Sequence, residues 1–365
     1  MRLTAGLIAT VLVFGTGPGV APAQAQQDSR WLFGAKRDGA EMKPAVYGSY
    51  TRGCVAGAEK LPDDGETWQA MRLSRNRHWA HPKTIALVKR LSRDGKRVGW
   101  NGLLVGDLTQ PRGGPMTSGH ASHQAGLDAD VWLTPMPDRR LSRKEREETS
   151  AISMLQRDRN GVIVHQKLSK KRFTKAHAGI IETAARYREV ERIFVHPAIK
   201  KELCEQNPDR PAWLRKVRSQ FGHHYHFHIR LGCPAGSPGC RPQRPIPSYG
   251  CEKANLKWWL NVAYGPPKKP APGTAKKAPP KKKRAVVLSK LPTQCRAVLT
   301  AKGTSGSPSQ TVAEIAALLP AHQRAATVPV KLGANVAVPT LRTGAPTEQA
   351  LAVDNALRPP APIGN

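Results

Sequence analysis

The spacing of apolar residues along the chain predicts a mixture of helices and short strands. The clearest helix covers residues 82–91, where Ile85, Val88 and Leu91 recur at helical spacing and Leu87 widens the same face. We expect this amphipathic helix to pack on a sheet. Apolar side chains that lie on one face of a helix need such a partner to be buried.

Further helices and strands follow the same reasoning. Helices are expected over residues 174–187 and 197–204, and apolar strands over residues 103–107 and 193–195. A charged stretch at residues 139–160 is expected to form a surface helix or excursion. Mixed helices and strands predict the α+β class, with a small antiparallel sheet flanked by helices and long loops.

One later strand carries imidazoles where a strand usually carries core residues. Four histidines stand within the six positions 223–228. In an unbroken strand, alternation places His224, His226 and His228 on one face and Tyr225 on the opposite face with the apolar residues. Each imidazole can bind a metal or transfer a proton. This crowding favours a chemical site over isolated structural histidines.

An earlier loop offers further metal ligands. Gly119 and Gly126 give this loop the freedom to fold back, so that His123 can lie beside Asp130 at the start of another apolar strand. Together with one histidine of the later strand, they give two imidazoles, one carboxylate and an open fourth position. That ligand set is typical of catalytic rather than structural zinc.

The remaining acidic and histidine residues are less distinctive. Asp128 is expected to be a turn residue or to support a ligand. His120 is open to three interpretations, as a further metal ligand, a partner of a ligand or a substrate contact, and spacing does not choose among them. The histidines without comparable spacing are interpreted as structural or solvent-exposed: His78, His81, His165, His177, His196 and His322.

Arginines and a proline-rich and glycine-rich loop also lie close to these motifs in the sequence. Arg72, Arg75 and Arg77 could bind substrate carboxylates, although exposed arginines are common at protein surfaces. Residues 110–116 precede the first histidine motif and are expected to form a wall of the cleft.

Several sequence blocks together resemble a known family. The blocks are GCVAGA at 53–58, WQAMRLSRNR at 68–77, GHASHQAGLDAD at 119–130, RIFVHPAIK at 192–200 and HFHIRLGCP at 226–234. The histidine and aspartate spacing resembles the LAS group of zinc metallopeptidases, named for lysostaphin, D-alanyl-D-alanine metallopeptidases and the hedgehog signalling domain. More narrowly, the blocks resemble the penicillin-insensitive murein endopeptidases. The resemblance runs from about residue 30 to Trp259 and returns near Cys295.

The resemblance implies a division of roles among the site residues. A single zinc ion would be held by His123, Asp130 and His228, with His120 as a further metal-binding candidate. His226, the first histidine of the His-x-His pair, would be catalytic.

Two features of the family bear on the rest of the site. His223 falls where the family has a further active-site histidine, whereas strand alternation favours His224. Some members bind a second metal through an Asp-x-x-His pair. Here Asp158 is followed by Gly161 at the histidine position, so no second metal is expected.

The reaction that the resemblance implies is hydrolysis of the D-alanyl–meso-diaminopimelyl cross-link between peptidoglycan stem peptides. Zinc would polarise the peptide carbonyl and bring the pKa of bound water near about 7. Two alternatives stay open. One is a D,D-carboxypeptidase or dipeptidase of the same fold, and the other is a non-catalytic protein that binds the cell wall.

The start of the chain predicts export. Residues 1–25 contain a short apolar run interrupted by Gly15, Gly17 and Pro18, and they end in a small-residue cleavage pattern. These features indicate a secretory signal peptide rather than a membrane span. We therefore expect a soluble periplasmic protein that begins near Gln26 and has no later transmembrane segment.

The cysteine count fits an oxidising compartment. The chain has six cysteines, and sequence alone leaves their pairing open. The resemblance implies three disulfides: Cys54 with Cys295, Cys204 with Cys251, and Cys233 with Cys240.

Charge and composition suggest partners and domain boundaries. The formal net charge of +32 predicts attraction to polyanions. For an exported protein these are peptidoglycan stem peptides and acidic cell-wall polymers rather than nucleic acid, although many lysines could serve only to solvate the chain. Residues 26–262 are expected to form the peptidase domain, followed by a proline-rich and lysine-rich linker at 263–292. A mostly disordered tail is expected at 293–365, anchored at Cys295, with a short helix at 312–319.

Overall fold

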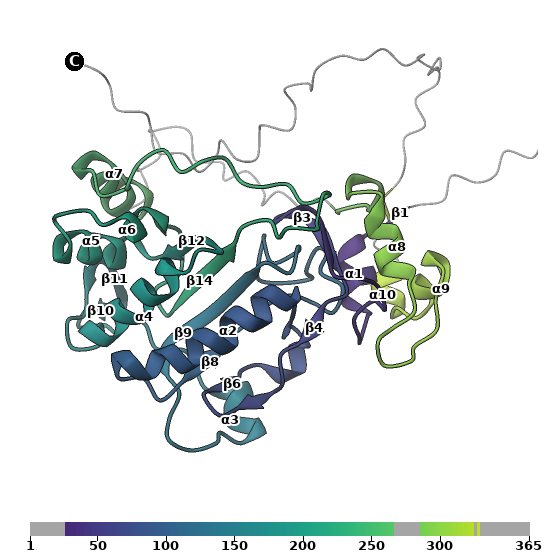
Figure 1. The fold of residues 1–365 in the computed structure, drawn as a ribbon, viewed down its shortest axis with the longest axis horizontal. Helices are drawn as coiled ribbons and strands as arrows, with labels where there is room; N and C mark the ends of the chain where they lie inside the picture. Colours follow the sequence, from purple (N-terminus) through teal and green to yellow (C-terminus); the bar gives the residue numbers. More distant parts are fainter. Residues whose placement is uncertain (1–25, 266–284, 325–326, 329–365) are drawn as a thin grey trace, which may run out of the picture.

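A seven-stranded sheet runs through the centre of the molecule in the computed structural model, which describes residues 26–265, 285–324 and 327–328 (Figure 1). From edge to edge its strands are β13 (Val217–Ser219), β12 (Val190–Val195), β14 (His226–Leu231), β9 (Asp128–Pro135), β8 (Leu103–Val105), β6 (Trp68–Ala70) and β5 (Asp64–Gly65). The pairs β12–β13 and β6–β8 are parallel, and the other neighbours are antiparallel. The α+β class is confirmed, but the sheet is larger than predicted and mixed. Strands as short as β5 and β13 are too short to show a period in the sequence.

The core lies against one face of the two central strands. Ala129 and Val131 of β9 pack with Phe227 and Ile229 of β14 in one large buried cluster. Helices α2 (Pro82–Asp94) and α4 (Lys175–Arg186) cover this face, which confirms both predicted helices (Figure 1). The other face of β9 and β14 therefore carries the polar residues.

The remaining elements surround the sheet. The predicted strands at residues 103–107 and 193–195 are β8 and β12 of the sheet, and the predicted helix at 197–204 is α5. The further helices are α3 (Arg143–Glu148), α5 (Pro197–Gln206), α6 (Ala212–Lys216) and α7 (Lys253–Lys257), with short turns η1 (Leu73–Arg75), η2 (Gly95–Val98) and η4 (Leu288–Lys290) and a π-helical segment η3 (Trp258–Ala263). Small two-stranded sheets pair β1 (Gln26–Gln27) with β15 (Thr327–Val328), β2 (Ala45–Ser49) with β3 (Arg52–Ala56), β4 (Glu59–Lys60) with β7 (Trp79–Ala80), and β10 (Leu155–Arg157) with β11 (Ile163–Leu168). Within the described residues, none of the helices is long and apolar enough to cross a lipid bilayer.

A second, smaller core joins the two ends of the described chain. Helices α8 (Gln294–Thr300), α9 (Val312–Ala317) and α10 (Ala321–Arg324) lie beside α1 (Ser29–Gly34) at one end of the molecule (Figure 1). Leu32 and Phe33 pack with Val298, Leu299 and Ile315 in this terminal cluster.

The sequence predicted a mostly disordered tail from residue 293 onward, and within that stretch the structure describes the helices α8, α9 and α10 of the terminal cluster. Its few apolar residues are buried by a segment far away in the sequence, and no local pattern reveals such a partner. The expected short helix is present as α9. The expected signal peptide at residues 1–25, residues 266–284 of the expected linker and the tail beyond residue 328 lie outside the described residues. The predicted domain boundaries stay predictions.

Covalent and polar links hold the terminal cluster to the rest of the fold. The three predicted disulfides are present, and the Cys54–Cys295 bond joins β3 to α8. The buried Arg112 guanidinium donates to the carbonyl oxygens of Val298, Leu299 and Ala301 at 3.1, 2.8 and 2.7 Å. These contacts satisfy carbonyl groups at the end of α8 that the helix itself leaves without partners.

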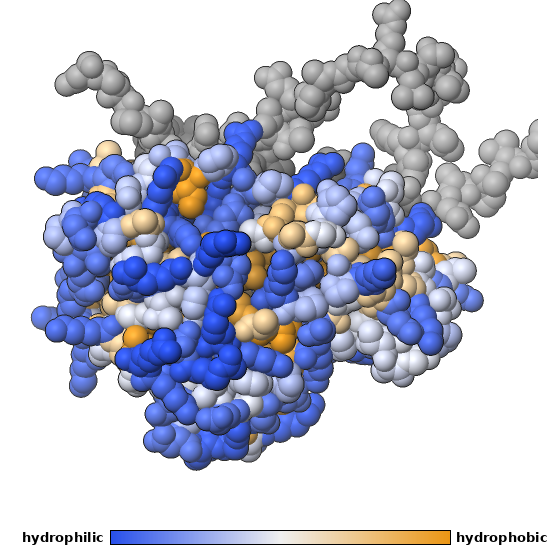
Figure 2. All heavy atoms as spheres, viewed as in Figure 1, coloured by the Kyte–Doolittle hydropathy of each residue, from blue (hydrophilic) through white to orange (hydrophobic). Residues whose placement is uncertain are grey.

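The surface is strongly polar. Figure 2 shows a face covered mostly by hydrophilic side chains, with apolar side chains in small separated patches. This distribution fits a chain with a formal net charge of +32.

Candidate metal centre

The register between β9 and β14 brings the two histidine motifs together. His228 pairs with Asp130, and Phe227 pairs with Val131. Because side chains alternate along a strand, Asp130 and His228 lie side by side on the face opposite the core.

The loop before β9 carries His123 to the same place. His123 adopts a left-handed backbone conformation, with φ of 65°, and Gly126 has φ of 70°. The backbone N–H of His123 donates to Asp128 at 2.9 Å, and its carbonyl accepts a hydrogen bond from the Thr109 hydroxyl. A Cβ atom at Gly126 would lie 2.9 Å from the backbone nitrogen of His81, so this turn requires glycine. The predicted folded-back loop is thus observed.

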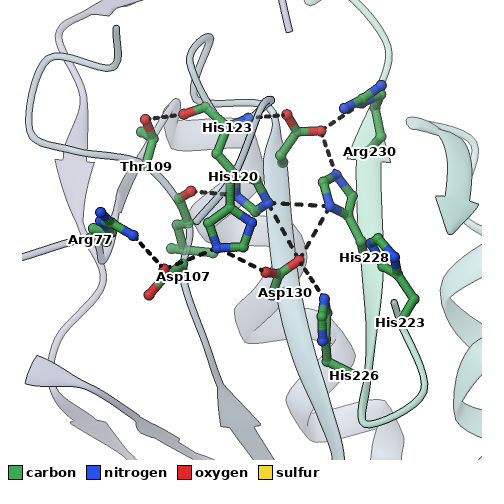
Figure 3. A network of polar contacts seen from close by, with 12 residues as sticks. Arg77, Asp107, Thr109, His120, His123, Asp130, His223, His226, His228 and Arg230 are labelled. Atoms are coloured by element: carbon green, nitrogen blue, oxygen red, sulfur yellow. Dashed lines mark hydrogen bonds and ion pairs between the residues drawn. The ribbon is translucent and has the colours of Figure 1, made fainter. Parts of the chain in front are cut away.

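Three buried atoms form a compact triangle, which we call the donor triangle (Figure 3). The Nε2 atom of His123 lies 3.2 Å from Nδ1 of His228 and 3.4 Å from Oδ1 of Asp130. The third side, from His228 Nδ1 to Asp130 Oδ1, is 3.3 Å. Donors placed tetrahedrally around zinc at about 2.0–2.1 Å are about 3.3 Å apart. The spacing of the donor triangle therefore suits such an ion.

The hydrogen bonds around the donor triangle leave its lone pairs without a donor. His123 Nδ1 donates to the carbonyl oxygen of Leu108 at 2.5 Å, and His228 Nε2 donates to Asp128 Oδ1 at 2.8 Å. In the neutral rings the opposite nitrogens then carry lone pairs that face each other. The buried Asp130 Oδ1 has no hydrogen-bond partner within the described part of the chain. Grouping buried acceptors in this way is unfavourable unless a cation lies among them.

The charges near the donor triangle also favour a bound cation. Burial opposes ionisation of Asp130, but His226 and His123 hold the pKa of its carboxyl well below the usual range. Burial also opposes a charge on His228, yet Asp128 and Asp130 raise the pKa of this imidazole. Without a metal ion, these charges favour a protonated His228, so the donor triangle attracts positive charge.

His120 lies at the edge of the donor triangle. Its Nε2 is 3.0 Å from Asp107 Oδ2 and 3.6 Å from Asp130 Oδ2. His120, His123 and Asp130 offer donor atoms that all lie within 4.8 Å of one another, so this group could hold a metal ion. Both a ligand role and a supporting role for His120 are compatible with this position.

Asp107 is a site residue that sequence reasoning missed. Its buried carboxylate accepts a hydrogen bond from Arg77 at 3.0 Å and contacts His120 (Figure 3). It also accepts one from Arg75 at 3.1 Å. Burial would raise the pKa of Asp107, but His120 and the two arginines lower it below its usual range. Its signal in the sequence is a carboxylate just after the fully buried strand β8.

His226 lies beside the donor triangle. Its Nε2 lies 3.6 Å from Asp130 Oδ1, and its buried Nδ1 has no hydrogen-bond partner among the described residues. Burial lowers the pKa of His226 to about 4, so the ring is neutral at pH 7. A neutral imidazole beside a metal centre can accept a proton.

The structure places the two neighbouring histidines, His223 and His224, in different surroundings. The ring of His223 lies 4.8 Å from that of His226 and 5.8 Å from that of His228, centre to centre. His224 instead bonds to the Ser153 hydroxyl at 2.9 Å and has His196 as a ring neighbour at 6.1 Å.

The alternation argument for His224 and Tyr225 was therefore wrong. The strand β14 begins only at His226, and φ values of 69° at Gly222 and 53° at His223 break the extended backbone before it. Tyr225, expected on the core side, lines a cavity beside the metal centre. Gly222 is the one local signal of this break.

The cavity beside the metal centre has a volume of about 250 Å³. Its lining includes Arg72, Arg75, Asp107, His120, Asp130, Trp132, Tyr225 and His226. Residues 110–116, which we expected to form a wall, are buried and do not line it. A peptide entering this cavity would meet imidazoles, carboxylates and guanidinium groups.

Comparisons with known proteins agree with the geometry. The model of one protein family, described as penicillin-insensitive murein endopeptidase, matches residues 46–300. A penicillin-insensitive murein endopeptidase of Haemophilus influenzae is 40% identical over 242 residues, which cover 65% of this chain and 78% of that protein. Proteins of the same description from Salmonella typhimurium and Salmonella heidelberg are each 39% identical over 253 residues, covering 69% of this chain and 85% of each relative. The chain is therefore a peptidase and belongs to the family of penicillin-insensitive murein endopeptidases.

Proposed function

We propose that the protein is a zinc-dependent endopeptidase that hydrolyses D-alanyl–meso-diaminopimelyl cross-links between peptidoglycan stem peptides. The observation that carries the proposal is the donor triangle of His123, Asp130 and His228, whose sides measure 3.2 to 3.4 Å. Two imidazoles and one carboxylate leave a coordination position open for water or substrate, as catalytic zinc requires. The names of the relatives support murein as the substrate.

The chain's own residues supply orientation and proton transfer in this proposal. Zinc bound at the donor triangle would polarise the scissile carbonyl and make water a stronger acid. His226 accepts a proton from the attacking water at Nε2 and then delivers it to the leaving amine, so that hydroxyl and hydrogen end on the two products. His223, next to His226, assists as a second active-site histidine.

The supporting residues of the site fix the positions of these groups. Asp128 keeps the His228 ring turned so that Nδ1 faces the metal position. His120 belongs to the proposed metal site because its Nε2 lies between the carboxylates of Asp107 and Asp130.

We place the enzyme in the periplasm. The three disulfides require an oxidising compartment, and a murein substrate lies outside the cytoplasm. The net charge of +32 supports attraction to peptidoglycan carboxylates and other acidic wall polymers.

The test uses the purified full-length mature protein and one defined cross-linked muropeptide dimer. Digestion is followed by mass spectrometry before chelation, after chelation and after zinc is added back, and the bound metal is measured on the same samples. We expect one dimer to give two monomers, with activity lost on chelation and restored by zinc. His226→Ala should bind metal and cleave the dimer far more slowly than the wild type.

Other outcomes would replace the proposal. Conversion of the dimer after complete metal removal would exclude the zinc mechanism. Trimming of uncrosslinked pentapeptide with the dimer left intact would indicate the D,D-carboxypeptidase alternative. Dimer binding without cleavage would indicate a non-catalytic wall-binding protein.

A further inference from the structure

Arg75 is the exposed member of a charge cluster at the cavity beside the metal centre. Its Nη1 lies 3.1 Å from Asp107 Oδ2, and 47% of its side chain is exposed. Arg77 forms an ion pair with the same carboxylate, with its Nη1 3.0 Å from Asp107 Oδ2, and only 7% of its side chain is exposed. Two guanidinium groups therefore share one carboxylate. The uncompensated positive charge faces the cavity through Arg75.

Arg72 adds a second guanidinium to the same cavity wall. It lies over the ring of Trp132, 5.7 Å from the ring centre, and donates to the carbonyl oxygen of Thr149 at 2.8 Å. Among the described residues it forms no ion pair within 4.0 Å. An arginine held by an aromatic face and a neutral carbonyl retains both its charge and several free donors.

The backbone that carries both arginines is strained. Arg72 and Asn76 flank the turn η1 and have φ values of 60° and 51°, a conformation that costs energy for residues other than glycine. Hydrogen bonds from Ser74 to Glu147 and from Asn76 to the Arg37 carbonyl hold the segment in place. These hydrogen bonds offset the strain and hold the backbone of the two arginines beside the cavity.

Three short contacts connect Arg75 to the metal centre. They run from Arg75 to Asp107 at 3.1 Å, from Asp107 to His120 at 3.0 Å and from His120 to Asp130 at 3.6 Å. One residue of extended peptide spans about 3.3–3.6 Å. The chain of contacts sets an upper limit, so a substrate group held by Arg75 lies within about three residues of a carbonyl at the donor triangle, and a group on the residue next to that carbonyl is within reach.

We propose that Arg72 and Arg75 bind the free carboxylate on the carbon attached to the scissile amide nitrogen of the substrate. This inference rests on the proposed function. In the D-alanyl–meso-diaminopimelyl cross-link that carbon bears a free carboxylate, whereas within an ordinary peptide chain the same position is an amide. A guanidinium recognises a carboxylate through two parallel charge-assisted hydrogen bonds. The arginine pair therefore selects cross-links over peptide bonds inside proteins.

The experiment compares two dimers that differ in one group, the free carboxylate or a carboxamide at that carbon. kcat/KM is measured for the wild type, Arg75→Gln, Arg75→Lys and Arg72→Gln. Arg97→Gln serves as a charge control because its side chain is 82% exposed and pairs with Asp94 at 3.5 Å. Binding of both dimers is also measured in the His226→Ala background, and metal content and circular dichroism verify each variant.

We expect the wild type to prefer the carboxylate dimer by about tenfold to a hundredfold, the size of a hydrogen bond between charged groups. Arg75→Gln should lose most of this preference, because its kcat/KM should fall much more on the carboxylate dimer than on the carboxamide dimer. Arg75→Lys should keep part of the preference, Arg72→Gln should show a smaller loss, and Arg97→Gln should retain it. The binding constants in the His226→Ala background should follow the same order.

Two results would overturn the inference alone. One is wild-type cleavage of both dimers at equal rates, and the other is an equal loss on both dimers in Arg75→Gln, which would mark Arg75 as purely structural. Cleavage of neither dimer by the zinc-loaded wild type would overturn the proposed function and this inference together.

Discussion

Asp128 is the residue that joins the two halves of the proposed metal centre. Its Oδ1 accepts from His228 at 2.8 Å and from Arg230 at 2.6 Å, and its Oδ2 accepts from the backbone N–H of His123 at 2.9 Å. One buried carboxylate thus orients an imidazole on β14 and fixes the loop that carries the other imidazole. Asp128 is not part of the donor triangle, but its hydrogen bonds orient two of the three side chains that form it.

Asp128→Asn should weaken metal binding by about tenfold to a hundredfold. The amide oxygen can still accept from His228, but the amide nitrogen then faces the backbone N–H of His123, and two donors oppose each other. Competition with a chelator of known affinity measures the change. Asp138→Asn, at an exposed position, is the control. Equal affinities in Asp128→Asn and the wild type would show that Asp128 does not position the ligands.

His226→Ala should lower kcat by about a hundredfold to ten-thousandfold while the metal content stays at the wild-type level. The reason is that the ring lies 3.6 Å from Asp130 without belonging to the donor triangle. His224→Ala is the matched control, because the His224 ring bonds to the Ser153 hydroxyl and not to a residue of the donor triangle. A loss of metal in His226→Ala would make His226 a ligand. A comparable loss of kcat in His224→Ala would contradict the assignment of roles.

Two helices of the fold begin with the same His-Pro pair. In α2 the Nδ1 of His81 accepts from the backbone N–H of Lys83 at 3.2 Å, and in α5 the Nδ1 of His196 accepts from that of Ala198 at 3.1 Å. The proline that follows each histidine suits the first helical position, where no N–H is needed. Burial lowers the pKa of His81 to about 4 and that of His196 to about 2, so both rings stay neutral acceptors at pH 7.

The cap at His81 should make α2 sensitive to acid. The folded-state pKa lies below the unfolded value of about 6.5, so the stabilisation is present above pH about 6.5 and is lost as the pH falls toward about 4. His81→Asn keeps an N-cap acceptor without titrating. The free energy of unfolding should fall between pH 7 and pH 5 in both proteins. The decrease should be about 1 to 2 kcal/mol smaller in His81→Asn than in the wild type. Urea unfolding at each pH measures the free energy of unfolding.

The control for this experiment is His322→Asn, whose exposed ring lies in α10. It should keep the full acid sensitivity of the wild type. If His81→Asn behaves in the same way as His322→Asn, another group accounts for the acid sensitivity.

How far sequence predicts this fold depends on how local the determining contacts are. The helix over residues 82–91 was predictable because its own apolar spacing specifies the buried face. Strand alternation failed at His224 because two residues with positive φ precede β14, and a pattern argument assumes unbroken extended backbone. Motif resemblance predicted that His123, Asp130 and His228 would lie together, as they do in the donor triangle. The role of Asp107 was not predictable, because it depends on Arg75 and Arg77 folding back from another segment.

At the scale of the whole molecule, the terminal cluster ties the two ends of the described chain to the peptidase core. The Cys54–Cys295 disulfide joins residues 241 positions apart, and the Arg112 side chain fastens the end of α8 to the segment before the first histidine motif. The backbone carbonyl of Arg112 also accepts from Val55 at 3.2 Å. The three links meet where β3, α8 and the Arg112 segment come together.

Replacing Cys54 and Cys295 together by serine should destabilise the protein by about 3 kcal/mol more than replacing Cys233 and Cys240, because the first bond closes a far longer loop in the unfolded chain. The terminal helices should also become cleavable by protease under native conditions, since α8 then depends on Arg112 and a small apolar core. Urea unfolding measures the first effect and limited proteolysis with mass analysis the second. If both double variants unfold at the same urea concentration with α8 protected, packing rather than the disulfide holds the terminal cluster in place.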